Sequence, residues 1–414
     1  MIKKTVAFHT LGCKVNEYES EKLSKELEAR GWIPVSFSDD AAVYVVNTCS
    51  VTKIADHKSR QILNRAASQS KKNGAVTVAM GCYASIEKSG LTADLIIDNK
   101  DRDRAADLIE ELFEKEASFE DEPGPSFTRP RQRTRAFIKI EDGCDSFCSY
   151  CIIPYARGPV RSISPDEIIR EAKECALAGI KEIVITGINV NRYGAGLITE
   201  RPAFTGEPLA GLLSRIAEET GIGRIRLSSV EPGLINKDFV SRIVEIKSVC
   251  PHFHMALQSG SGSVLKRMNR RYTPEEYMKS VELLRRYYDD PALTTDVIVG
   301  FPGETADEHR ESMDFIRAAD LSKLNVFRFS GRPGTPAFSM KGQIRNAVKE
   351  ERAHEMLALG DELRASYEQR HRGRVLEVLL EEAEENGAVS GYSKEYIRVT
   401  LPAGTPGEIV QTTF

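Results

Sequence analysis

The sequence has no long apolar run: nowhere does it reach the ~18 consecutive apolar residues that a membrane-spanning helix requires. Its start, MIKKTVAFHTLG, has no small-residue cleavage site, so we predict no signal peptide and expect a cytoplasmic protein that binds no membrane. Strong charge bias is also missing, because 57 Lys and Arg stand against 61 Asp and Glu. Any contact with nucleic acid must therefore come from local basic patches.

Disulfides are not expected either, although the chain has eight cysteines, because the cytosol keeps thiols reduced. Metal binding or catalysis is the better interpretation of these thiols. With 414 residues, 41% of them hydrophobic, the chain is expected to form two or three globular domains.

The order of apolar patterns predicts an α/β domain over residues 1–116. Short β-branched runs alternate with amphipathic stretches, the runs at 5–9, 42–46, 76–80 and 95–97 and the stretches at 17–30, 53–72 and 102–116. Such alternation is typical of a doubly wound parallel sheet covered by helices. Residues 117–134 are rich in proline and predict a linker, either a solvated tether or a strand that contacts phosphate.

A longer α/β region is expected over residues 135–370. Six strand–helix units follow one another, with strands at 136–140, 182–186, 224–228, 252–257, 294–299 and 324–329. This pattern predicts a partial (β/α)6 barrel with its chemistry at the C-terminal strand ends. Over residues 371–414 the pattern changes to four short strands, which predict a small antiparallel β-barrel.

Three cysteines, Cys144, Cys148 and Cys151, lie in GCDSFCSYC directly after the first strand of the central region. We name them the central triad. Iron–sulfur clusters are held by cysteine thiolates, and three thiolates leave one iron of a four-iron cluster open to another ligand. A zinc site with a more distant fourth ligand is the alternative.

Cys13, Cys49 and Cys82, the N-terminal triad, each follow a strand, in VAFHTLGC, YVVNTC and TVAMGC. Because the ends of parallel strands meet at one edge of a sheet, these thiols are predicted to converge. A single cysteine in such a place is usually a small buried residue, but the same placement three times favours a second metal centre. We interpret the two remaining cysteines, Cys175 and Cys250, as structural.

These motifs resemble those of the radical S-adenosylmethionine methylthiotransferases over nearly the whole chain. GCDSFCSYC is similar to their defining triad, with Tyr150 at the aromatic position before the last cysteine. LQSGSGSVLKRMNRRYT and TTDVIVGFPGET resemble two further family segments, and the C-terminal strands resemble a TRAM module. FHTLGCKVN, KIEDGCDSFCSYCIIPYARG and TGINVNRYG resemble the branch that acts on N6-threonylcarbamoyladenosine next to the anticodon of tRNA. The isopentenyladenosine branch has a YGCQMN-like start, and the ribosomal aspartate branch has an LGCPKN-like start. This sequence has neither of these motifs.

The resemblance implies two [4Fe–4S] clusters, and S-adenosylmethionine as both radical source and methyl donor. The central triad would serve the cleavage of S-adenosylmethionine to a radical, which can attack the unreactive C2–H bond of adenine. The N-terminal triad would serve the sulfur that becomes the methylthio group. The implied partners are tRNA, an electron donor and a sulfur source, and we expect a monomer.

Cofactor contacts are expected where strand ends face the central triad. The candidates are Tyr150, Thr186, Gly187, Ser228, Glu231, Gln258 and Asp296. Glycine allows close approach of the backbone, and the polar groups can bind ribose or the methionine amine. A capping or loop role is the alternative for each.

The tRNA contact is less defined, because residues 371–414 are net acidic. Base stacking on Tyr392 or Tyr396 is one hypothesis. A basic cluster in the central region comprises Lys266, Arg267, Arg270 and Arg271. It is either a tRNA contact or a solvated face. Two other functions compete with methylthiolation of tRNA: radical modification of a protein side chain, and zinc-dependent RNA binding.

Overall fold

The computed structural model describes residues 4–116, 134–197, 207–385 and 387–414. The linker predicted at 117–134 lies outside the described residues, apart from its last residue. No helix among the described residues is both long and apolar enough to cross a membrane.

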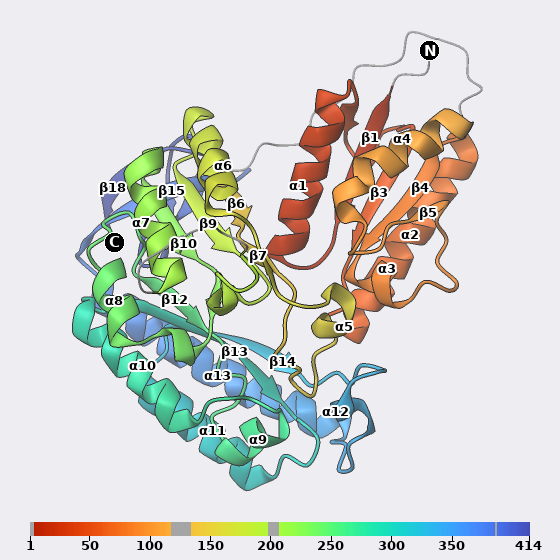
Figure 1. The fold of residues 1–414 in the computed structure, drawn as a ribbon. Helices are drawn as coiled ribbons and strands as arrows, with labels where there is room; N and C mark the ends of the chain where they lie inside the picture. Colours follow the sequence, from red (N-terminus) through yellow and green to blue (C-terminus); the bar gives the residue numbers. More distant parts are fainter. Residues whose placement is uncertain (1–3, 117–133, 198–206, 386) are drawn as a thin grey trace.

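The N-terminal sheet is wholly parallel and has the strand order β2-β1-β3-β4-β5 (Figure 1). Its strands are β1 (Thr5–Thr10), β2 (Ile33–Val35), β3 (Val43–Thr48), β4 (Val76–Gly81) and β5 (Leu95–Ile96). Helices α1 (Lys14–Ala29) and α4 (Ala105–Glu116) pack on one face, and α2 (Lys53–Asn73) packs on the other. Alternate residues of each strand face the two helical layers, so the doubly wound prediction is confirmed. The edge strand β2 and the short helix α3 (Cys82–Ile86) were not predicted.

The central region contains six parallel strands in an open barrel. They are β6 (Arg135–Lys139), β9 (Glu182–Thr186), β10 (Arg224–Leu227), β12 (His252–Met255), β13 (Ala292–Val299) and β14 (Lys323–Arg328). Strand β10 pairs with β9, and β11 (Ser229–Val230), which follows β10 directly, pairs with β12. The segment 224–230 therefore connects the two halves of the curved sheet. The outer helices are α6 (Pro165–Leu177), α7 (Pro208–Thr220), α8 (Lys237–Ile243), α10 (Pro274–Tyr287), α11 (Ala306–Ala319) and α13 (Asn346–His371). The predicted (β/α)6 barrel is confirmed.

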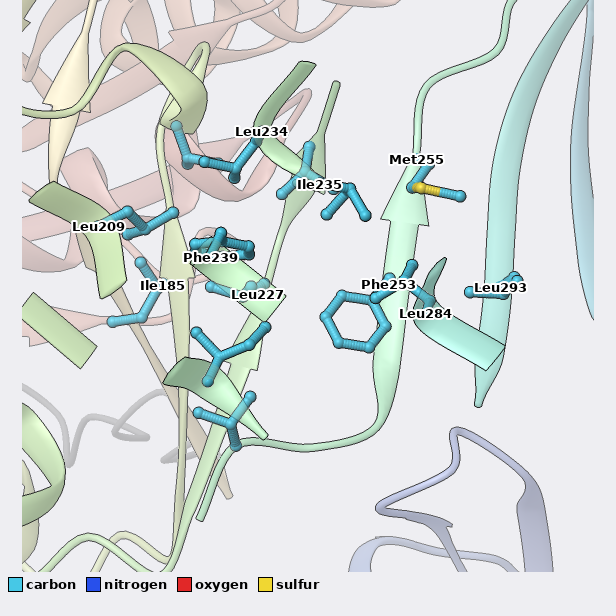
Figure 2. Packing of buried hydrophobic residues seen from close by; sticks show 14 of the residues in the cluster. Ile185, Leu209, Leu227, Leu234, Ile235, Phe239, Phe253, Met255, Leu284 and Leu293 are labelled. Atoms are coloured by element: carbon cyan, nitrogen blue, oxygen red, sulfur yellow. The ribbon is translucent and has the colours of Figure 1, made fainter. Parts of the chain in front are cut away.

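A large apolar core holds these strands and helices together. Figure 2 shows Ile185, Leu227 and Phe253 of the strands beside Phe239 of α8 and Leu284 of α10. Each of these side chains is almost fully buried. Burial of one such side chain contributes about 1.5–3 kcal/mol, so this core makes the barrel a rigid support for loops at its strand ends.

The C-terminal sheet is antiparallel, with the order β17-β16-β15-β18. Its strands are β15 (Val375–Ala383), β16 (Val389–Ser393), β17 (Arg398–Leu401) and β18 (Ile409–Thr413). The antiparallel prediction is confirmed, but within the described part of the chain β17 and β18 are edges, so the sheet is a half-barrel.

This half-barrel packs against the N-terminal ends of the central strands. Arg226 of β10 donates hydrogen bonds to the carbonyls of Ser393 and Lys394. The Tyr396 ring stacks on His252 at 4.1 Å and on Tyr392 at 4.8 Å. The ring of Tyr396 thus has partners within the protein, and base stacking on Tyr392 or Tyr396 stays a prediction.

Candidate active site

The N-terminal triad is gathered by the register of β1, β3 and β4. These strands pair in parallel, and the three cysteines follow them at the same edge of the sheet. A Cβ built on Gly12 would lie 3.0 Å from Cys49 Sγ, so the loop that carries Cys13 passes directly over Cys49. Burial raises the pKa of the Cys49 thiol to about 11, and the nearby thiols of Cys82 and Cys13 add to the increase. The predicted convergence is therefore supported by contact and by charge.

The central triad lies in the loop between β7 (Glu141–Asp142) and α5 (Ile153–Arg157), just past the end of β6. Burial raises the pKa of the Cys151 thiol to about 12, with the thiols of Cys148 and Cys144 adding to it. Phe147, in the middle of the loop, has φ +45°, a conformation that costs a non-glycine residue about 1–3 kcal/mol. Asn269 supports this turn by donating a 3.0 Å hydrogen bond to the Phe147 carbonyl. The loop is thus held in a tight bend that places its three thiols close together.

Among the described residues, no three His, Cys, Asp or Glu side chains are grouped closely enough to hold one ion. A tetrahedral zinc site needs its ligands to converge on one point. A four-iron cluster takes thiolates at different corners, so its ligands stand further apart. Each triad offers three cysteines, the ligand type that holds such clusters.

One arginine donates a hydrogen bond to a sulfur atom in each triad. Arg270 Nη1 lies 3.2 Å from Cys148 Sγ, and Arg157 Nε lies 3.3 Å from Cys82 Sγ. A cation that donates to sulfur favours the thiolate, which is the form that binds metal. Both triads therefore suit metal-bound thiolates.

The basic cluster was interpreted incorrectly at Arg270. Its side chain is only 6% exposed and pairs with Glu231 at 2.9 Å, instead of facing solvent or tRNA. Arg267 pairs with Glu308 at 2.7 Å. Arg270 is a residue of the central site, and its position next to a cysteine could not be read from a run of basic residues.

The structure places the predicted cofactor contacts around the barrel mouth. Ser228 lies between β10 and β11, and its buried Oγ has no hydrogen-bond partner among the described residues. Gln258 has φ +69°, a strained conformation typical of functional sites. The backbone N–H of Gln258 donates a hydrogen bond to the backbone carbonyl of Asp296 at 2.9 Å. The buried Ser228 hydroxyl without a partner indicates room for a polar ligand at the end of β10.

Thr186 and Gly187 form the corresponding end of β9. Thr186 is buried, and a Cβ built on Gly187 would lie 2.2 Å from Glu141 Oε1, so only glycine fits there. The Glu141 carboxylate in turn accepts a hydrogen bond from the backbone N–H of Asn189. Gly187 therefore keeps the end of β9 against the base of the cysteine loop.

The Tyr150 side chain is packed instead of facing the mouth. Its ring meets Phe301 edge-on, with centroids 6.4 Å apart, within a small apolar cluster. A contact of Tyr150 with cofactor remains a prediction. Because the ring is packed, the backbone of Tyr150 is the part expected to make this contact.

The loop of Cys13 carries a charge that acts on a residue of the barrel. Against the opposing effect of burial, His254 lowers the pKa of Asp296, and Lys14 adds to the decrease. Lys14 directly follows Cys13, whereas Asp296 lies on β13 inside the barrel. The charge of Lys14, next to Cys13, thus helps to stabilise the charged form of Asp296 in the barrel.

A further contact that the sequence did not reveal lies beside Cys49. Arg332, which follows β14, donates to Ser50 Oγ at 2.5 Å and to Asp56 at 2.7 Å. Ser50 is the residue after Cys49, so the central domain holds this part of the N-terminal triad from outside.

Comparison with known proteins defines the class of the enzyme. Residues 138–316 match the Radical SAM superfamily, and residues 5–98 match an uncharacterized protein family, UPF0004. The radical S-adenosylmethionine methyltransferase TsrM from Kitasatospora setae, solved with cobalamin and a [4Fe–4S] cluster, superimposes with a TM-score of 0.59. The match covers 81% of this chain and 77% of TsrM at 16% identity, so it shows a shared fold. The barrel is that of a radical S-adenosylmethionine enzyme.

Curated relatives narrow this class. Threonylcarbamoyladenosine tRNA methylthiotransferase MtaB of Bacillus subtilis is 39% identical, over 96% of this chain and 90% of the relative. MtaB of Thermotoga maritima is 36% identical over 98% and 93%. A tRNA-2-methylthio-N(6)-dimethylallyladenosine synthase of Alkaliphilus oremlandii is 36% identical over 90% and 81%. This chain belongs to the radical S-adenosylmethionine tRNA methylthiotransferase family.

Proposed function

We propose that this enzyme transfers a methylthio group to C2 of N6-threonylcarbamoyladenosine next to the anticodon of tRNA. The observation that carries the proposal is the pair of cysteine triads, one at the end of each parallel sheet, with an arginine donating to a sulfur in each. The MtaB names of the two relatives given first support the substrate.

Both triads suit a [4Fe–4S] cluster, with the cysteines of each triad as its ligands. When bound, such a cluster supplies an iron open to an outside ligand, S-adenosylmethionine at the central triad and sulfur at the N-terminal triad. Arg270 donates a hydrogen bond to Cys148 Sγ and places a positive charge beside this triad. The unpartnered Ser228 hydroxyl and the strained segment at Gln258 provide polar contacts for S-adenosylmethionine.

The position of Cys13 explains how two separate sites can serve one substrate. The charge of Lys14, which follows Cys13, helps to lower the pKa of Asp296 in the barrel, and this supports a position of the N-terminal triad near the S-adenosylmethionine site. A base held between the triads meets radical chemistry on one side and sulfur on the other. The reaction also requires an electron donor and a sulfur source, and we place it in the cytoplasm.

Nucleoside mass spectrometry of tRNA tests the substrate directly. Cells that lack this gene should lose 2-methylthio-N6-threonylcarbamoyladenosine and accumulate the unmodified threonylcarbamoyl base. Unchanged nucleosides would contradict the proposal. Anaerobically purified and reconstituted protein should contain about eight irons per chain, four for each cluster.

A second candidate substrate is N6-dimethylallyladenosine, because the Alkaliphilus oremlandii relative is named for that product. Purified enzyme should be given tRNA that carries either base. We expect methylthiolation of the threonylcarbamoyl form, and turnover of the dimethylallyl form alone would transfer the assignment to the second candidate.

A further inference from the structure

We propose that Arg157 is a positioning residue that couples docking of the two domains to the chemistry of the N-terminal triad; the inference rests on the proposed function, in which that triad holds a cluster. Arg157 ends α5 of the central domain, in the segment that follows Cys151. Its guanidinium lies where the two domains meet, and it contacts Asp142 of β7 as well as residues of the N-terminal domain. In Figure 1, α5 lies beside α3, the helix that begins with Cys82.

Arg157 contacts the N-terminal domain with all three guanidinium nitrogens. Nε donates to Cys82 Sγ at 3.3 Å, Nη1 to Glu19 at 2.8 Å and Nη2 to Asn16 at 2.8 Å. The side chain is 0% exposed. A buried guanidinium in this setting needs all of these partners, because an unpaired buried charge is strongly destabilising.

Asn16 extends this contact to the other two cysteines. Its Nδ2 donates to the Leu11 carbonyl at 2.8 Å and to the Thr48 carbonyl at 3.0 Å. Leu11 lies two residues before Cys13, and Thr48 directly precedes Cys49. Arg157 therefore contacts Cys82 directly, and through Asn16 it supports the backbone that carries Cys13 and Cys49.

The charges around Arg157 do not balance within the buried network. The buried network contains three cations, Arg102, Lys139 and Arg157, and two carboxylates, Glu19 and Asp142. Each of these side chains is at most 9% exposed. The network thus has one cation in excess, and Arg157 directs its Nε at Cys82. A thiolate bound to a cluster would supply the missing negative charge.

The other two cations of the network, Arg102 and Lys139, border a cleft. The cleft has a volume of about 460 Å³ and lies between α1 and β8 (Arg161–Ser162), whereas Arg157 and Cys82 do not line it. Arg102 contacts Glu19 and Asp142 but no cysteine. Arg102→Gln therefore removes the same charge from the same network without touching a sulfur, which makes it a matched control.

The test measures the midpoint reduction potential of the N-terminal cluster in full-length protein with Cys148→Ala, so that the central cluster does not contribute. Hydrogen bonds to cluster sulfurs help to set the potential. Arg157→Gln should shift it to a more negative value, and Arg102→Gln should shift it less. Arg157→Lys, which keeps the charge and the docking, should give an intermediate value and serves if the Gln variant does not fold.

The second part of the test measures activity in enzyme that keeps Cys148. Arg157→Gln should reduce methylthiolation about 10- to 100-fold, as loss of a hydrogen bond to a charged partner predicts, and leave cleavage of S-adenosylmethionine within about twofold. Equal shifts of the potential in Arg157→Gln and Arg102→Gln, or equal loss of both activities, would overturn this inference but leave the proposed function unaffected. A Cys148→Ala protein that binds no iron would instead overturn the proposed function, and the inference with it.

Discussion

The central triad comes from one short loop, whereas the N-terminal triad collects its thiols from the ends of three strands that are far apart in the sequence. The difference extends to the arginines. Arg270 and Cys148 both belong to the central domain, but Arg157 reaches Cys82 from the other domain. The central site is therefore complete within one domain, and the surroundings of the N-terminal site are complete only when the two domains dock.

The largest expected effect separates the two triads. Cys148→Ala should abolish cleavage of S-adenosylmethionine, whereas Cys49→Ala should leave cleavage intact and abolish methylthiolation. Each variant should lose about four of eight irons. Cleavage is measured as 5′-deoxyadenosine by chromatography, with Cys175→Ala, a buried cysteine of α6 that belongs to neither triad, as the control. Methylthiolation by the Cys49 variant would refute the division of roles.

The two arginines allow a second comparison. Arg270→Gln leaves Cys148 without its cationic donor and should lower S-adenosylmethionine cleavage about 10- to 100-fold. The matched control is Arg267→Gln, since Arg267 pairs with Glu308 at the partly exposed side of the same segment. If both variants cleave at the same rate, the contact of Arg270 with sulfur has no role in the reaction.

The carboxylates beside the triads should respond to pH with opposite signs. Burial raises the pKa of Glu141 from 4.5 to about 8, so its charged form is disfavoured in the folded state and stability falls as the pH rises between these values. Against the opposing effect of burial, Arg157, Lys139 and Arg102 hold the pKa of Glu19 at about 2. Glu19 therefore contributes stability above pH 4.5 that is lost as the pH falls toward 2.

Denaturant unfolding of the metal-free protein at a series of pH values measures this contrast. Glu141→Gln should remove part of the loss of stability between pH 5 and 8, and it should gain most at the upper end of that range. Glu19→Gln should be destabilised throughout the same range. A difference between Glu141→Gln and the parent that does not change with pH would contradict the raised pKa.

The smallest expected effect concerns backbone strain. Gln258 adopts φ +69° at the central site, whereas the comparable left-handed position before Cys82 is already glycine, Gly81 at φ +91°. Gln258→Gly should therefore raise the free energy of unfolding by about 1 kcal/mol, while weakening binding of S-adenosylmethionine. Unfolding and equilibrium binding measure the two effects. Destabilisation by glycine would show that side-chain contacts of Gln258 outweigh the strain.

Local patterns predicted much of the fold. The observed bounds of β9 coincide with the predicted strand at 182–186, because this segment is a short apolar run. The strand β2 was missed, since its three residues at the sheet edge include a proline and carry too short a pattern. The central triad was predicted from spacing alone, and the N-terminal triad from its repeated place after strands.

The sequence by itself determined the order of the three sheets, the six cysteines and the loop that brings three of them together, because these features depend on neighbours along the chain. Only the tertiary structure decided that Arg157 and Asn16 support the N-terminal triad and that Arg270 faces a cysteine. Those contacts join segments from different domains or distant loops. Burial, charge balance and the docking of two separately patterned surfaces select them, and none of these is written in a local stretch of residues.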